Sequence, residues 1–183
     1  MPALVDATGA PAAGEAEAPV TVVVYACARC PYCSKLVPAL YREMTGGSLH
    51  GTARMVFRTF PIRGHEGSTE AGLAFVAAAE MGKFWEYLLR AYADFDSFGA
   101  GATRRWAAEV GLDTDTFAMF VDDPRSRESL VASKKEGLAN GVEETPTVFL
   151  DGRRWVGDLE IDELVDAIGE EADRGRGELC AGH

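Results

Sequence analysis

The sequence predicts an α/β fold in the order β-α-β, then helices alone, then β-β-α. Two observations support this prediction: the spacing of the apolar residues changes from strand-like to helical and back, and Gly, Pro and Asn stand at the changes. A length of 183 residues suits one domain, or one domain with an insertion. We therefore expect a first α/β half over residues 20–66, an all-helical insertion over 67–143 and a second half over 144–174.

The first half begins with an apolar strand. Residues Thr21–Tyr25 form a β-branched run of strand length, which is typical of a strand buried on both faces. A helical pattern follows, with apolar residues three and four positions apart from Leu36 to Met44, and Gly46-Gly47 ends it. Residues 53–60 predict a second strand, which Pro61 closes. Strand, helix and strand of this length predict two parallel neighbouring strands.

From Ser68 to Gly141 the pattern indicates helices only. The expected helices cover residues 69–81, 83–93 and 103–110, a turn capped by Asp113, and a stretch from the Asp123-Pro124 cap to the Asn140-Gly141 stop. The second half predicts a hairpin, with strands 147–150 and 153–156 joined by Asp151-Gly152. Asp158 is expected to cap a final helix with the apolar stripe Ile161, Leu164, Val165 and Ile168.

The charge and the two ends of the chain limit the possible partners. The chain has 18 Lys and Arg against 29 Asp and Glu, a net charge of −11, which argues against nucleic acid and anionic membranes as partners. No apolar run reaches the roughly 20 residues needed to cross a bilayer. Residues 1–19 are rich in Ala, Gly, Pro and Glu and predict a flexible lead rather than a signal peptide, and residues 175–183 predict a loose tail. We expect an extracytoplasmic (periplasmic) location if an export signal has been removed, and a cytoplasmic one otherwise.

The motif Cys30-Pro31-Tyr32-Cys33 stands where the first strand gives way to the helix. Two thiols three residues apart in the first turn of a helix can reach each other and form a disulfide. The free N–H groups and the dipole of a helix N-terminus favour thiolate over thiol. We therefore predict that Cys30 is a nucleophile and that Cys33 attacks the mixed disulfide that Cys30 forms. The alternative is a pair of small core hydrophobes.

Four segments carry a family resemblance: residues 30–33 (CPYC), 56–61 (VFRTFP), 82–86 (GKFWE) and 141–152 (GVEETPTVFLDG). In this order, from Val20 to about Glu171, the chain resembles the DsbA-like thiol–disulfide oxidoreductases. The resemblance implies a thioredoxin-like fold with an all-helical insertion. It also implies an enzyme that exchanges disulfides with protein substrates and a redox partner protein, with no cofactor beyond its own cysteines. We expect a monomer.

The resemblance assigns the second half of the site to Thr145-Pro146. In the family, the Pro before the third strand is cis and lies against the two cysteines, so that the backbone of Thr145 can pair with an extended substrate segment. The alternative is an ordinary trans Pro at the start of a strand. Pro31 and Tyr32 complete the expected substrate-binding residues. Tyr32 replaces a His found in strongly oxidising members, which implies a more moderate redox poise; it could equally be part of an exposed substrate platform.

Two further cysteines leave other functions open. Cys27, Cys30, Cys33 and Cys180 make four thiols, a number that suits zinc or an iron–sulfur cluster. A Cys-ligated metal-binding protein is therefore the alternative function, although Pro146 would occupy the space of a metal. Cys27 could also be buried and inert, form a disulfide with Cys180, or exchange with Cys30. A third reading is a chaperone-like binding module in which the cysteines are incidental.

The charged residues near the motif depart from the family in one respect. Members often bury an acidic group from the first strand behind the second cysteine, but Val22–Tyr25 contains no carboxylate. We therefore expect proton transfer through water, or through a Glu or Lys from elsewhere. Arg29 either favours the Cys30 thiolate or is an exposed, solvated side chain. The three histidines, His50, His65 and His183, are expected in loops or on the surface.

Overall fold

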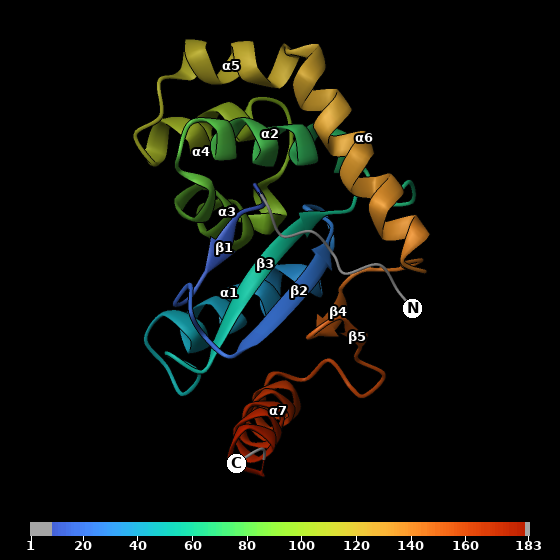
Figure 1. Ribbon diagram of the computed structural model, residues 1–183. Coiled ribbons are helices and arrows are strands. Elements are labelled where there is room, and N and C mark those ends of the chain that lie inside the picture. Colours follow the sequence, from blue (N-terminus) through green and yellow to red (C-terminus); the bar gives the residue numbers. More distant parts are fainter. Residues whose placement is uncertain (1–8, 182–183) are drawn as a thin grey trace. The chain divides into compact units, whose positions relative to one another are not determined.

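A computed structural model describes the backbone of residues 9–181 and the side chains of residues 9–177. The predicted order of strands and helices is confirmed (Figure 1). The elements are β1 Ala12–Ala13, β2 Val20–Ala26, α1 Cys33–Thr45, β3 Ala53–Thr59, α2 Ser68–Glu80, α3 Phe84–Ala93, the 3-10 helix η1 Phe95–Ser97, α4 Ala102–Glu109, α5 Thr114–Asp122, α6 Pro124–Ala139, β4 Thr147–Leu150, β5 Arg153–Arg154 and α7 Ile161–Ala181. In the described part of the chain, no helix has both the length and the apolar character needed to span a membrane.

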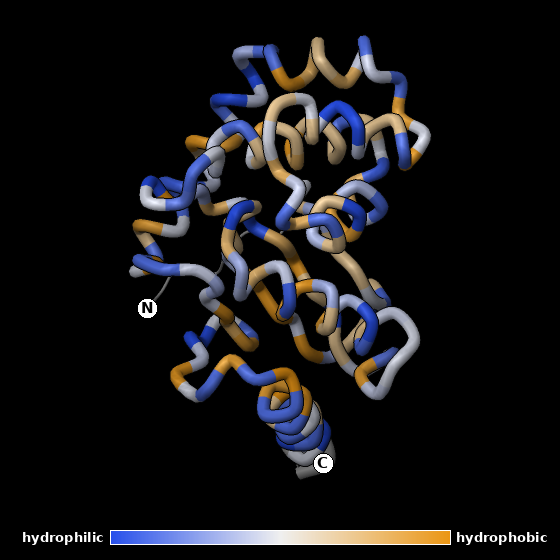
Figure 2. Tube along the Cα trace, turned by 180° about the vertical axis from the view of Figure 1, so that it is seen from behind, coloured by the Kyte–Doolittle hydropathy of each residue, from blue (hydrophilic) through white to orange (hydrophobic). Residues whose placement is uncertain are grey.

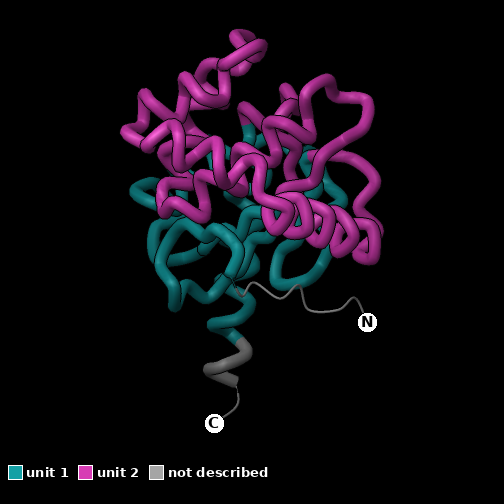
Figure 3. The backbone as a smooth tube through the Cα atoms, turned by 90° about the horizontal axis from the view of Figure 1, so that it is seen from above, with its two compact units in different colours: residues 1–24, 36–58, 146–183 teal, residues 25–35, 59–145 magenta. Residues whose placement is uncertain are grey.

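The chain divides into two compact units (Figure 3). Unit 1 consists of residues 1–24, 36–58 and 146–183, and unit 2 consists of residues 25–35 and 59–145. Unit 2 therefore contains the helices α2 to α6 and also the short stretch that carries Cys30 and Cys33. Unit 1 contains α1 from Leu36 onward, α7, and most of the sheet.

The sheet has the strand order β1-β3-β2-β4-β5, so β2 and β3 are neighbours as expected. Six of the seven residues of β2 and all four of β4 are buried, which explains why both read as apolar runs rather than as alternating strands. The hairpin is also confirmed, since β4 and β5 pair antiparallel with Leu150 opposite Arg153. Its turn residues Asp151 and Gly152 have φ angles of 45° and 79°, as a type I′ turn requires.

Two segments at the ends of the chain are more ordered than the sequence suggests. Ala12 and Ala13, within the expected flexible lead, pair antiparallel with Val56 and Met55 of β3. An edge strand offers unpaired N–H and C=O groups, and this short segment satisfies some of them. Helix α7 continues to Ala181, through most of the expected loose tail. Along α7, apolar residues are interspersed among hydrophilic ones (Figure 2). The apolar residues Leu164, Ile168 and Ala172 lie on one face of the helix, and this face is buried.

The expected cap of α7 is wrong. Asp158 does not stand at the cap position, because the helix begins only at Ile161. The carbonyl oxygen of Asp158 accepts a hydrogen bond from Trp155 Nε1 at 2.9 Å. Leu164 N–H donates to Glu160 O at 3.1 Å. The Trp155 ring folds back over Gly157, where an added Cβ would lie 2.3 Å from it. This local turn occupies the residues just before the helix.

The core of unit 2 is aromatic. The Phe75 ring of α2 makes edge contacts with Phe84, Tyr87 and Tyr92 at centroid distances of 5.9, 6.1 and 5.6 Å. Helix α2 contacts α3, α5 and α6, and it is apolar on nearly all sides, as a central helix must be.

Two of the predicted helix caps are confirmed. The carboxylate of Asp113 accepts a hydrogen bond from Thr116 N–H, and the carboxylate of Asp123 accepts one from Arg125 N–H.

Candidate active site

The two central cysteines lie where β2 ends and α1 begins. After Ala26 the chain makes a turn in which Cys30 N–H donates to Cys27 O at 3.1 Å. Ser34 N–H then donates to Cys30 O at 3.1 Å, the first bond of the α-helical type. Pro31 therefore lies in the first turn, where its missing N–H costs no hydrogen bond. Cys30 and Cys33 thus stand at the end of α1 where backbone N–H groups are free.

The sulfur of Cys30 makes hydrogen bonds to two backbone groups. Cys33 N–H donates to Cys30 Sγ at 3.5 Å, and the Cys30 thiol donates to Thr145 O at 3.4 Å. A hydrogen bond from the Cys33 thiol, helped by backbone N–H groups and the nearby Thr145 hydroxyl, lowers the pKa of Cys30 to about 5 from its ordinary 9.0, against the opposing effect of burial. That hydroxyl is buried and has no hydrogen-bond partner among the described residues. At neutral pH, Cys30 is therefore a thiolate.

Cys33 has the opposite character. It is fully buried, and burial raises the pKa of its thiol well above the ordinary value, an effect to which Cys30 adds. The pair therefore combines one ionised thiol with one protonated thiol that donates to it. This split is what a nucleophile and a resolving thiol require.

The four expected substrate-binding residues differ in exposure. Pro31 and Tyr32 are exposed, Tyr32 by 74%, although Cys30 beside them is only 2% exposed. Thr145 is brought to Cys30 through its carbonyl oxygen. Pro146 follows it directly and is buried. The position of the Pro146 ring against the sulfurs stays a prediction.

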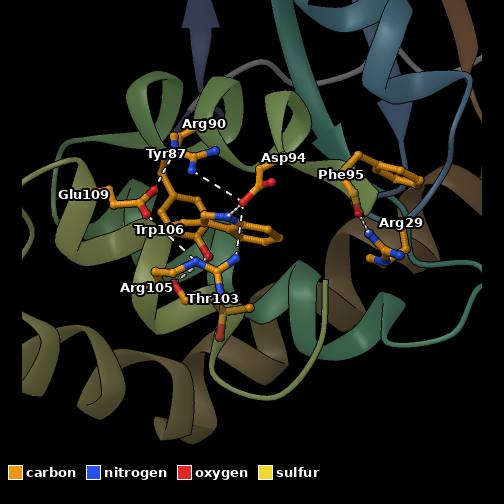
Figure 4. A network of polar contacts seen from close by, with 9 residues as sticks. All are labelled: Arg29, Tyr87, Arg90, Asp94, Phe95, Thr103, Arg105, Trp106 and Glu109. Carbon is orange, nitrogen blue, oxygen red and sulfur yellow. Dashed lines mark hydrogen bonds and ion pairs between the residues drawn. The ribbon is translucent and has the colours of Figure 1, made fainter. Parts of the chain in front are cut away.

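Arg29 is not the solvated side chain that the sequence allowed. Its guanidinium carbon lies 4.3 Å from the centroids of both the Phe95 and the Phe98 rings, and Nη1 donates to Phe95 O at 2.7 Å (Figure 4). Cation–π contacts and a charge-assisted hydrogen bond thus hold the residue that precedes Cys30. The sequence did not predict these contacts, because Arg29 and Phe95 lie more than sixty residues apart in the chain.

The segment that holds Arg29 is itself fixed by a carboxylate. Asp94 accepts hydrogen bonds from Trp106 Nε1 at 2.9 Å, Arg105 Nη2 at 3.2 Å and Arg90 Nη2 at 3.4 Å (Figure 4). Hydrogen bonds from Ser97 and Trp106 hold the pKa of Asp94 well below its usual range. Asp94 therefore stays ionised and anchors the start of η1, next to Phe95.

Cys27 has neighbours that the sequence did not identify. Its sulfur lies 3.3 Å from His65 Nδ1 and accepts a hydrogen bond from Arg29 N–H at 3.4 Å. Its carbonyl oxygen accepts from the buried hydroxyl of Tyr92 at 3.0 Å. His65 was expected only in a loop or on the surface. It does lie in the loop before α2, but it is half-buried there because it covers Cys27.

The thiols are all reduced where the structure describes them. Cys27, Cys30 and Cys33 are free and buried. The side chain of Cys180 lies outside the described residues, and so do the expected disulfide and metal set that include it. Within residues 9–177, no group of three or more His, Cys, Asp and Glu side chains is arranged to hold a metal ion.

Comparisons with known proteins agree with this geometry. The family model described as Thioredoxin matches residues 6–170. A thioredoxin-like oxidoreductase of Silicibacter pomeroyi superposes with a TM-score of 0.75 at 28% identity, covering 93% of this chain and 94% of that one. The thiol-disulfide exchange protein alpha-DsbA2 of Wolbachia pipientis superposes with a TM-score of 0.78 at 19% identity, covering 91% and 89%. The predicted thioredoxin-like fold of the DsbA type is confirmed.

The curated relatives are longer proteins. The Na(+)/H(+) antiporter NhaA 3 of Salinispora tropica is 35% identical over 156 residues, which make up 85% of this chain and 24% of the relative. This chain therefore spans about a quarter of the length of the curated relatives that it matches.

Proposed function

The chain belongs to the thioredoxin family, and we propose that it is a protein thiol–disulfide oxidoreductase in which Cys30 is the nucleophile and Cys33 the resolving thiol. The observation that supports this most directly is the placement of two free cysteines at the start of α1, with Cys33 N–H 3.5 Å from Cys30 Sγ. This placement shifts the pKa values of the two thiols in opposite directions. A thioredoxin-like oxidoreductase is also among the similar structures. The enzyme needs no cofactor beyond the two sulfurs.

The reaction has two exchange steps. The Cys30 thiolate attacks one sulfur of a substrate disulfide, a mixed disulfide forms, and the other substrate sulfur leaves as a thiolate. Cys33 then loses its proton and attacks Cys30 Sγ, so that the Cys30–Cys33 disulfide forms and the second substrate thiolate leaves. The same steps in reverse oxidise a substrate dithiol.

The electrostatics make the second step follow the first. While Cys30 is a thiolate, its charge adds to the burial that keeps Cys33 protonated. In the mixed disulfide Cys30 carries no charge, so this like-charge effect disappears. Cys33 is then easier to ionise at the step that uses its thiolate.

The exposed pair Pro31-Tyr32 and the Thr145-Pro146 segment form the proposed substrate-binding surface. The flat Tyr32 ring offers apolar contact area beside the nucleophile. The partners are protein segments with a thiol or disulfide, and a redox partner protein that restores the starting state. We place the reaction in an extracytoplasmic compartment, where disulfides persist, and expect a monomer.

The test compares three serine variants in insulin reduction and in oxidation of a dithiol peptide. Cys30→Ser should abolish both activities with unchanged circular dichroism, because the attacking sulfur is gone. Cys33→Ser should slow multiple turnover. Cys27→Ser, the matched control, leaves the Cys30–Cys33 pair intact and should stay active. Full activity of Cys30→Ser would contradict the proposal.

A further inference from the structure

Cys27 precedes Cys30 by three residues, the same spacing by which Cys33 follows it. The bond from Cys30 N–H to Cys27 O makes residues 27–30 a tight turn, and the Cα atoms at the ends of such a turn are less than about 7 Å apart. A disulfide requires a Cα separation in the same range. The bond from Arg29 N–H holds Cys27 Sγ against this turn.

His65 places a ring nitrogen against the buried sulfur of Cys27. The ring nitrogen Nδ1 is 3.3 Å from Cys27 Sγ, and the same side chain lines an open pocket with Arg63 and Lys134. A proton leaving Cys27, which is 0% exposed, can thus reach the surface through the imidazole.

We propose that Cys27 is a second resolving thiol, with His65 as its proton acceptor. This inference rests on the proposed function, which supplies the mixed disulfide at Cys30. Cys27 gives its proton to His65 and attacks Cys30 Sγ. The Cys27–Cys30 bond forms, the bond between Cys30 and the substrate breaks, and the substrate sulfur leaves as a thiolate. The two electrons that leave the two enzyme thiols reduce the substrate disulfide, and no other oxidant is needed.

The charges around Cys27 favour this step only after Cys30 has reacted. Burial is the main cause that raises the pKa of Cys27, and the Cys30 thiolate adds to it. That second contribution ends when Cys30 enters a mixed disulfide. Other groups also face Cys27. The backbone N–H groups of Arg29 and Ile62 and the Lys134 cation lower the pKa of Cys27, and the Arg29 guanidinium interacts with its charge. The neutral Tyr92 hydroxyl donates to its carbonyl oxygen.

The sequence allows a direct test by peptide mapping. Trypsin cleaves after Arg29 and Lys35, so Cys27 is released on residues 1–29, whereas Cys30 and Cys33 remain together on residues 30–35. A Cys30–Cys33 disulfide therefore lies within one peptide, but a Cys27–Cys30 disulfide joins two. Cys180 falls on residues 177–183, and a link to it has a different mass.

The experiment treats reduced Cys33→Ser protein with oxidised glutathione. We expect glutathione to appear on Cys30 and then to leave as residues 1–29 become linked to residues 30–35. In the matched control Cys27→Ser/Cys33→Ser, glutathione should stay on Cys30. Adding His65→Gln to Cys33→Ser should slow formation of the link by at least about tenfold, since a positioned base typically contributes about 100-fold or more.

Equally persistent glutathione in Cys33→Ser and in the double variant would overturn the inference, and so would a link to residues 177–183. The parent chain tests the proposed function separately. It must form the disulfide within residues 30–35, and so must Cys27→Ser, which also shows that this variant folds. If the parent forms no such disulfide, the proposed function fails, whatever Cys27 does.

Discussion

Replacing Cys33 by alanine should raise the pKa of Cys30. The Cys33 thiol is the largest contributor to the pKa of about 5, and alanine cannot donate a hydrogen bond. A hydrogen bond to a charged group contributes about 1.5–3 kcal/mol. At 1.36 kcal/mol per pKa unit, its loss corresponds to roughly 1 to 2 units. Cys30 in Cys33→Ala should therefore titrate about 1 to 2 pH units higher than in the parent chain.

The assay is the pH dependence of alkylation of Cys30 by iodoacetamide, followed on the peptide 30–35. At pH 7, a thiol with a pKa near 5 has about 100-fold more thiolate than a thiol with a pKa of 9.0. The thiolate of lower pKa is, however, the weaker nucleophile, and this lowers its rate by roughly 40- to 100-fold. Neutral pH therefore discriminates poorly. At pH 6 the parent should still react roughly 10- to 20-fold faster than an ordinary thiol by the same relation.

Cys33→Ser is the matched control, because its hydroxyl can still donate to Cys30. Its alkylation midpoint should stay nearer to that of the parent than to that of Cys33→Ala. Equal midpoints for the parent and Cys33→Ala would refute the role given to the Cys33 thiol. A parent midpoint near 9.0 would refute the thiolate itself.

Two further predictions concern stability. Gly137→Ala in α6 should lower the free energy of unfolding by about 1–3 kcal/mol in urea, because the added Cβ would lie 2.6 Å from the Phe60 ring. In the control Gly169→Ala in α7, the added Cβ meets nothing within 4 Å, so this change should be neutral or stabilising by up to about 1 kcal/mol. The reduced form should gain stability as pH rises from about 5 to 9.0, because the pKa of Cys30 is lower in the folded than in the unfolded chain, and the gain should disappear as pH falls through about 5. The Cys30–Cys33 disulfide form should not show this rise, and equal slopes for the two forms would contradict it.

The sequence predicted what depends on near neighbours. The hairpin turn at Asp151-Gly152, the caps at Asp113 and Asp123 and the buried run of β2 all follow from local rules of backbone conformation and periodicity. The cysteine pair at the start of α1 followed in the same way, because spacing and helix position decide whether two thiols can meet. Asp158 was wrong as a cap because the helix begins only at Ile161, after a turn in which Trp155 Nε1 donates to Asp158 O, and no cap rule includes such a turn.

The missing parts of the site depend on distant residues. His65 stands 38 residues from Cys27, and Tyr92 stands 65 residues from it. Neither has a spacing that marks it, since a histidine in a loop and a tyrosine in an amphipathic helix are common. The cationic Arg29 next to the motif was the one available signal, but its aromatic partners become its neighbours only after folding.

These distant contacts show that the helical insertion helps to position the residues around Cys30. The residues just before Cys30 are held by two contacts from the segment of α3 and η1. Tyr92 donates to the carbonyl oxygen of Cys27, and the carbonyl oxygen of Phe95 accepts from Arg29. The chain that follows the last inserted helix supplies Thr145, whose carbonyl oxygen faces Cys30. This explains why residues 25–35 form one compact unit with residues 59–145. Helix α1 provides the free N–H groups of the site, but the insertion fixes the loop on which the sulfur of Cys30 depends for its position.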